Sequence, residues 1–178
     1  MKKIIGVVGL FLALFSFGLG ASALAPSKEC DWKRPDFGEA RLVTKFSKIK
    51  SLDDGIIRKE TISKYSYDYP KNLRGSYKYI TVITNFEYSE GEKILADIAY
   101  ESDFRFNTKR KMCECLSSTC CYECKESAKV EAFTRRKNET LSKGSSTIKN
   151  KFKNGYNTYE EIEYDLKCDS NGEISIEE

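Results

Sequence analysis

Apolar and polar residues alternate with a period of two through the middle of the chain, which is typical of half-buried β-strands. Two such runs, Tyr77–Ser89 and Lys93–Glu101, flank a Glu-Gly-Glu stretch at 90–92 and therefore predict a β-hairpin. The apolar face of this hairpin would carry Ile80, Val82, Thr84, Phe86, Tyr88, Ile94, Ala96, Ile98 and Tyr100.

The loop length of this hairpin decides which side chains lie opposite each other. A three-residue loop at 90–92 pairs Tyr88 with Ile94 and Phe86 with Ala96. A two-residue loop would instead place Ile80 opposite a glutamate, Glu101. We therefore expect the three-residue loop.

A second hairpin is predicted near the C-terminus. Its last strand turns Ile162, Tyr164, Leu166 and Cys168 to one side and charged residues to the other. A three-residue loop at 154–156 (Asn-Gly-Tyr) pairs Ile148 with Ile162, and Lys149 with Glu161. This register predicts an apolar inner face and an outer charge ladder, with each pair contributing roughly 0.2–1 kcal/mol. A two-residue Asn-Gly turn would set Ile148 against Glu161.

Further strands are predicted at Leu42–Ile49, Ile56–Tyr67, Phe104–Lys109 and Lys129–Arg136. Eleven tyrosines and ten phenylalanines against only three prolines favour β structure. The sequence thus predicts one all-β domain, a disulfide-stapled antiparallel β-sandwich or β-barrel of about eight strands. The pattern leaves the choice between sandwich and barrel open.

The N-terminus has the layout of a secretory signal peptide. Lys2 and Lys3 precede an apolar run, Ile4–Leu19, and an Ala-Ser-Ala cleavage pattern ends at Ala23. A retained membrane anchor is the alternative, but the run is shorter than the roughly 20 residues that a spanning helix needs. We therefore expect a signal peptide at 1–23, a secreted, extracellular domain at 24–178, and no membrane span after signal removal.

Cysteine is the most informative residue type, because seven cysteines occur in a chain without histidine. Five of them fall in one short segment, and two lie nearer the ends: Cys113, Cys115, Cys120, Cys121 and Cys124, with Cys30 and Cys168. Such spacing occurs in thiolate metal clusters, but export to an oxidising compartment favours disulfides. We expect disulfide bonds, no metal and no cofactor.

The pairing of these cysteines stays open at the level of sequence. Cys30 and Cys168 could bond to each other and close a long loop, which the chain-entropy model values at roughly 4–5 kcal/mol. Alternatively, one or both reach into the central cluster. With seven cysteines one thiol is left over, and it is either buried or joins two chains in a disulfide-linked dimer.

The cysteine cluster falls between two predicted strands and is therefore expected to form a cysteine-rich loop at 110–127. Rigid exposed loops on β scaffolds are common recognition surfaces, although these cross-links could instead only staple the fold. The candidate binding residues are Lys109, Arg110, Lys111, Leu116, Ser117, Ser118, Thr119 and Tyr122.

A second candidate surface is basic. Arg135, Arg136 and Lys137 could join 109–111 in a patch for sulfated glycans or acidic lipid headgroups, or form an ordinary solvated face. Asn138 is in the only N-x-S/T sequon and predicts a glycoprotein. The formal net charge is only +3, which does not indicate a nucleic-acid partner.

Enzymatic activity is not expected. Without histidine the chain has no Ser-His-Asp or Cys-His pair, and no phosphate loop or dinucleotide fingerprint is present. The leading hypothesis is a secreted β domain that binds a protein or glycan partner through its cysteine-rich loop. The alternatives are a lipocalin-like carrier of a small apolar ligand, with the ligand inside a barrel, and a protease inhibitor with a disulfide-rigid loop.

Overall fold

The computed structural model describes residues 40–67, 76–139 and 143–177, and these form an all-β fold. The elements are β1 (Ala40–Ser51), η1 (Asp53–Gly55), β2 (Ile56–Tyr67), β3 (Tyr77–Glu90), β4 (Lys93–Asn107), β5 (Met112–Cys124), β6 (Ala128–Glu139), β7 (Lys143–Asn154), β8 (Asn157–Cys168) and β9 (Ile174–Glu177). One sheet has the order β1-β2-β3-β4-β5 and the other has the order β6-β7-β8-β9. In the described ranges we find no helix long and apolar enough to cross a lipid bilayer.

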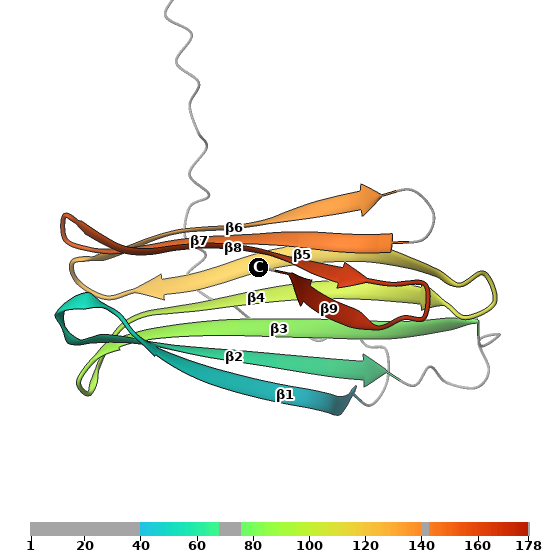
Figure 1. Cartoon of the computed structure of the whole chain (residues 1–178), viewed down its shortest axis with the longest axis horizontal. Helices are drawn as coiled ribbons and strands as arrows, with labels where there is room; N and C mark the ends of the chain where they lie inside the picture. The colour runs from blue at the N-terminus through green and yellow to red at the C-terminus, as the bar shows by residue number, and fades with distance from the viewer. Residues whose placement is uncertain (1–39, 68–75, 140–142, 178) are drawn as a thin grey trace, which may run out of the picture.

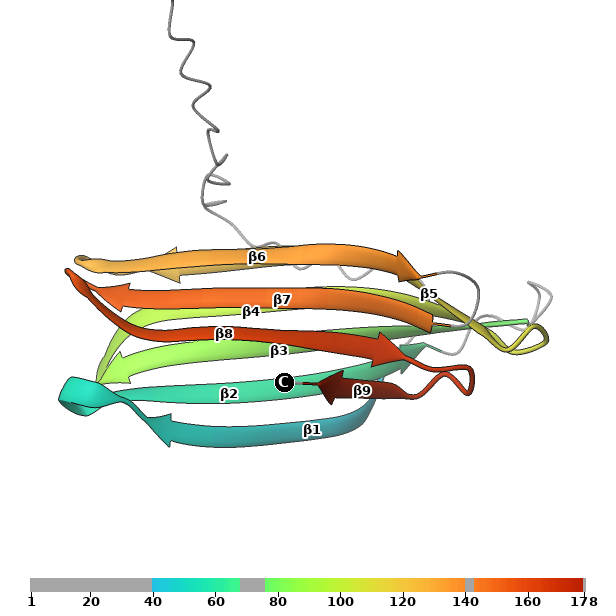
Figure 2. The same cartoon turned by 45° about the horizontal axis from the view of Figure 1, so that its top comes forward.

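The two sheets lie face to face as a sandwich (Figure 1; Figure 2). The chain passes from one sheet to the other at the β5–β6 turn, while β1 and β9 end their sheets on the opposite side. Among the described strands no ladder joins β1 to β9 or β5 to β6, so the fold is a sandwich and not a closed barrel. The predicted fold class is confirmed, and the structure decides between its two forms.

An aromatic layer fills the space between the sheets. Phe86, Tyr88, Tyr100 and Phe104 from the five-stranded sheet are fully buried. Phe152 from the four-stranded sheet stacks on Tyr88, with ring centroids 4.0 Å apart and an interplanar angle of 11°. The even-numbered residues of β3 predicted to face inward, Ile80 to Tyr88, are all buried.

The predicted register of the β3–β4 hairpin is wrong. The turn has only two residues, because Glu90 pairs with Lys93, and a bulge at Leu95 then shifts the register so that Tyr88 lies opposite Ala96. The bulge gives β4 one extra residue, so Leu95 is buried while Ile94, predicted to face inward, is 46% exposed. The apolar faces stay matched because the bulge compensates for the shorter turn.

The β7–β8 hairpin differs from its prediction in the same way. Asn154 pairs with Asn157 across a two-residue turn, and a bulge at Tyr159 follows. Lys149 therefore meets Glu163 instead of Glu161, and Ile148 meets Tyr164 instead of Ile162. The charge ladder itself is present, with ion pairs Lys149–Glu163 and Lys151–Glu161.

The segment predicted as a cysteine-rich loop at 110–127 is largely a strand. β5 pairs with β4 from Asn107↔Met112 to Ala96↔Cys124, and the residues predicted as a separate strand at Phe104–Lys109 largely complete β4. A bulge at Leu116 interrupts the alternation in β5. This bulge hides the strand from a simple period-of-two pattern, since Cys113 and Cys115 face inward before it and Ser118 after it.

Candidate functional site

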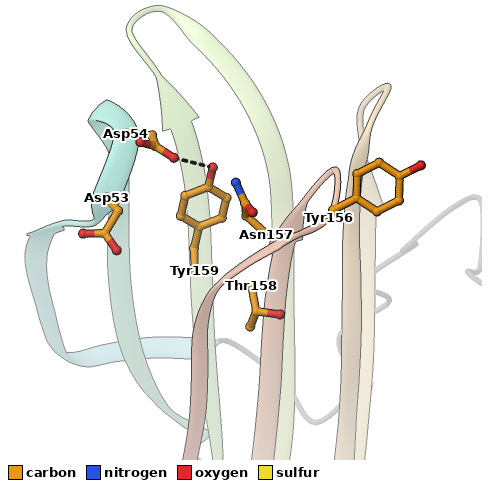
Figure 3. A pocket seen from close by; sticks show the side chains of 6 residues that line it. All are labelled: Asp53, Asp54, Tyr156, Asn157, Thr158 and Tyr159. Atoms are coloured by element: carbon orange, nitrogen blue, oxygen red, sulfur yellow. Dashed lines mark hydrogen bonds between the residues drawn. The ribbon is translucent and has the colours of Figure 1, made fainter.

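A recess opens at one end of the sandwich, between the β1–β2 turn and the β7–β8 turn (Figure 3). Its volume is about 620 Å³. Carboxylate, amide, hydroxyl and phenol groups line it, from Asp53, Asp54, Tyr156, Asn157, Thr158 and Tyr159.

Two tight turns build this recess. Asp54 and Gly55 both adopt the left-handed conformation, with φ of 57° and 75°, and the Leu52 N–H donates to the Ile56 carbonyl at 2.7 Å. The φ of Gly155 is 61° in the opposing turn. Gly and Asp are among the residues that tolerate this conformation best, so the local sequence favours both turns.

Tyr159 holds the two turns together. Its hydroxyl donates to Asp54 Oδ2 at 2.9 Å, and Figure 3 shows the ring standing between Asp54 and Asn157. The Asn157 side chain lowers the pKa of Tyr159, but the hydrogen bond to Asp54, desolvation and the charges of Asp54 and Glu90 raise it, and the net shift is upward. Tyr159 therefore stays a neutral donor at physiological pH.

Tyr156 flanks the recess and is fully exposed. In Figure 3 its ring points away from the Asp54–Tyr159 pair, so both turns present polar groups and one free aromatic ring. An exposed tyrosine combines a flat apolar face with a hydroxyl that can donate and accept.

A charge cluster is centred on the buried Glu160, the residue after Tyr159 in the sequence. Glu160 on β8 accepts from Arg58 Nη1 at 2.5 Å, from Lys50 Nζ at 3.1 Å and from the Tyr88 hydroxyl at 3.0 Å. Asn150 Nδ2 in turn donates to the Tyr88 hydroxyl at 2.9 Å. These contacts join both sheets.

The structure does not bring the predicted binding residues together. Lys109, Arg110 and Lys111 lie in the β4–β5 turn, at the end of the sandwich opposite the recess (Figure 1). Leu116 is at the β5 bulge, and Thr119 is exposed on the outer face. Ser117 donates to Asp103 at 2.6 Å on the outer face, whereas Ser118 bonds to the buried Ser146 at 2.7 Å. Tyr122 pairs with Ile98 and is half-buried.

One arginine of the predicted basic patch already has partners within the protein. Arg136 donates to the Leu116 carbonyl at 2.9 Å and lies 3.8 Å from Glu114, so it is engaged within the protein. The side chains of Lys137 and Asn138 are outside the described part, although the Asn138 backbone pairs with Gly144. Glycosylation at Asn138 therefore stays a prediction.

The cysteines take three different roles. Cys113 bonds to Cys168, which excludes the Cys30–Cys168 bridge and realises the alternative in which Cys168 reaches into the cluster. Cys121 is also disulfide-bonded, while Cys115, Cys120 and Cys124 are free thiols. Burial raises the pKa of all three free thiols, and that of Cys120 rises to about 12. Cys30 and the predicted signal peptide at 1–23 lie outside the described residues.

No group of three or more Cys, Asp or Glu side chains in the described ranges is arranged to hold a metal ion. Comparison of the chain with protein-family models, curated proteins and solved structures found no match. The site must therefore be interpreted from its own chemistry.

Sequence reasoning missed the residues of the recess. Their turn signals, Asp-Asp-Gly at 53–55 and Asn-Gly-Tyr at 154–156, are visible in the sequence. Nothing in the sequence indicated that these two turns, which lie about a hundred residues apart, meet at one end of the sandwich.

Proposed function

We propose that this protein is an extracellular recognition domain that binds a neutral glycan at the recess between the β1–β2 and β7–β8 turns. The observation that carries the proposal is that a fully exposed Tyr156 ring and the polar groups of Asp54 and Asn157 line the same recess. Sugars present apolar C–H faces and vicinal hydroxyls, so an aromatic ring together with carboxylate and amide groups matches both.

The charge of the recess supports the choice of a neutral ligand. Asp53 and Asp54 both line it, and the charge of nearby Glu90 contributes to raising the pKa of Tyr159. Sulfated or sialylated chains would be repelled by these carboxylates. The hydrogen bond between Tyr159 and Asp54 fixes one carboxylate before a ligand arrives, which reduces the entropy lost on binding.

The extracellular location rests on the signal-peptide pattern and is supported by the Cys113–Cys168 disulfide, since such bonds persist in oxidising compartments. The carrier hypothesis depended on a closed barrel, and the inhibitor hypothesis on a stapled loop. Among the described residues, neither hypothesis has a specific observation in its favour. The aromatic layer fills the interior that a carried ligand would need, and strand β5 is present where the inhibitory loop was expected.

Binding of the exported chain to an array of neutral oligosaccharides tests this proposal. Tyr156→Ala and Asp54→Asn should each weaken binding by at least about tenfold, or about 1.4 kcal/mol. Asparagine tolerates the left-handed conformation of residue 54, so the second variant changes the charge and leaves the turn intact. Lys109→Ala, at the opposite end, is the matched control. Absence of binding, or binding that both variants retain, would overturn the proposal.

A further inference from the structure

Strand β1 forms one edge of the five-stranded sheet, and its outer edge is unoccupied by any described strand. The strand is twelve residues long, and among the described strands it pairs only with β2. An edge of this length carries a row of backbone N–H and C=O groups that can pair with another extended chain. Figure 1 shows β1 at the outside of its sheet, on the side opposite the β5–β6 turn.

The side chains of β1 are unusually apolar for such an exposed strand. Phe46, which pairs with Ile62 on the inner face, is 57% exposed, and Ile49, which pairs with Lys59 on the outer face, is 72% exposed. Leu42 and Val43 are about half exposed near the start of the strand. An added strand would cover apolar side chains on both faces at once.

Exposed lysines usually protect an edge strand from unwanted pairing. In β1, two of the lysine side chains instead point toward the sandwich. Lys48 Nζ lies 3.3 Å from Glu60, and Lys50 Nζ lies 3.1 Å from the buried Glu160. Both cations are thus committed to carboxylates of the sandwich. A bulge at Val43 limits the regular part of the edge to Thr44–Ser51.

The positive charge of β1 determines which kind of incoming strand can pair with its edge. β1 contains Arg41, Lys45, Lys48 and Lys50 and no acidic residue. Arg41 and Lys45 have no ion-pair partner among the described residues, so they are available to an incoming carboxylate. Two β1 strands from two copies would bring their positive charges together, and like charges at close range destabilise a strand pair.

We propose that β1 is a docking edge for another protein, which adds an extended segment of alternating apolar and acidic residues alongside Thr44–Ser51. This inference is independent of the glycan site, because the strand and the recess have no lining residue in common. Backbone hydrogen bonds would supply much of the affinity, the apolar side chains of the segment would cover Phe46 on the inner face, and Lys45 on the outer face would select acidic residues.

A displayed library of ten-residue peptides tests the proposal with the full exported chain. Apolar residues alternate with positions that are randomised between Asp, Glu, Lys and Arg. Selected peptides should be acidic. Lys45→Glu should weaken the binding of these peptides by about tenfold, and it should improve the binding of peptides in which lysine replaces each acidic residue. A purely structural role of Lys45 would not reverse the preference. Phe46→Ser should weaken the binding of both the acidic and the lysine-substituted peptides.

Three outcomes would overturn the proposal. The library could yield no binder, or it could yield binders without a charge preference. Alternatively, sedimentation could show that the chain dimerises and that Phe46→Ser abolishes the dimer, in which case the occupant is a second copy. Thermal unfolding of each variant, with Ser175→Ala on exposed β9 as a matched control, separates loss of binding from loss of folding.

Discussion

Arg58 on β2 and Glu160 on β8 form a buried ion pair between the two sheets, with Nη1 and Oε1 2.5 Å apart. Both side chains are less than 10% exposed. Glu60 lies 3.4 Å from the same guanidinium, but Arg58 Nε has no hydrogen-bond partner in the described structure. The pair links the two sheets near their β1 and β9 edges, where no described turn connects one sheet to the other.

Glu160→Gln should therefore destabilise the protein strongly. The change leaves Arg58 buried without its main counter-charge, and breaking one partner of such a pair costs about 3–5 kcal/mol. Chemical denaturation measures the difference. Glu161→Gln is the matched control, because its partner Lys151 lies on the exposed face and such pairs contribute about 0–1 kcal/mol. Equal effects of the two variants would contradict a clamping role for Glu160.

The Cys113–Cys168 bond should be a major source of stability. It joins residues 55 positions apart, for which the chain-entropy model gives about 4 kcal/mol. Cys168→Ser should lower the free energy of unfolding by about that amount, measured by urea denaturation. Cys124→Ser, at a free thiol, should have a much smaller effect. A small loss in Cys168→Ser would mean that the native strands alone hold β5 against β8.

Three cysteines should remain as thiols that react slowly in the native protein. Cys115, Cys120 and Cys124 are free, and burial raises their pKa values, so the reactive thiolate is scarce at pH 8. A chromogenic disulfide reagent should detect these three thiols after unfolding without reductant, and fewer of them over the same time before unfolding. A count of seven thiols after unfolding would mean that no disulfide is present, and a count of one would mean that two of the three free cysteines have formed another disulfide.

Gly144→Ala should push the two sheets apart. A Cβ at this position would lie 2.7 Å from the Cys115 backbone nitrogen and 2.9 Å from the Glu114 carbonyl carbon, and neither is a flexible side chain. Overpacking of this kind typically costs about 1–3 kcal/mol. Thermal unfolding should show a lower midpoint, whereas Ser175→Ala should leave it unchanged. An unchanged midpoint in Gly144→Ala would show that the sheets are less tightly packed here.

The β8–β9 turn should loosen in acid. Asp169 Oδ1 accepts from the backbone N–H of Glu173 at 2.9 Å and of Asn171 at 2.8 Å, and these bonds lower the pKa of Asp169. A lowered folded pKa means that the stabilisation is complete above the unfolded value of about 4 and is lost as pH falls through the folded pKa. The protection of the β9 amides, which is the intrinsic exchange rate divided by the observed rate at the same pH, should fall below about pH 4.

Asp169→Ala should give the same low protection of the β9 amides at every pH and remove the acid dependence of that protection. Asp97→Ala, at an exposed position on β4, serves as the control and should preserve it. Acid-dependent exchange in β9 that persists in Asp169→Ala would assign the effect to another carboxylate.

The alternation of apolar residues determined most of the strands and their inner faces. Phe86, Tyr88, Ile98, Tyr164 and Leu166 are buried as the period of two requires, because successive side chains of a strand point to opposite faces. The same signal failed at β5, since a bulge at Leu116 breaks the alternation and the short Cys and Ser side chains carry little apolar pattern. β9 has only four residues and offered no periodic signal.

Register depended on tertiary structure. Both hairpins use a two-residue turn followed by a bulge, at Leu95 and at Tyr159. A turn and a bulge together preserve the matched faces that a longer turn would give, so pairing arguments from sequence cannot distinguish them. Glu160 lies inside the sandwich because it keeps the phase of Tyr164 and Leu166 along β8, a placement that its charge alone would argue against.

Sequence alone thus determined the fold class, the inward faces of the long strands and the presence of disulfide bonding, because these follow from local periodicity and chemistry. Only the tertiary structure decided that Cys168 meets Cys113, that the sheets stay open at β1 and β9, and that Asp54 meets Tyr159. These contacts join residues 55 to 105 positions apart. Their formation depends on how two twisted sheets stack, which no local pattern encodes.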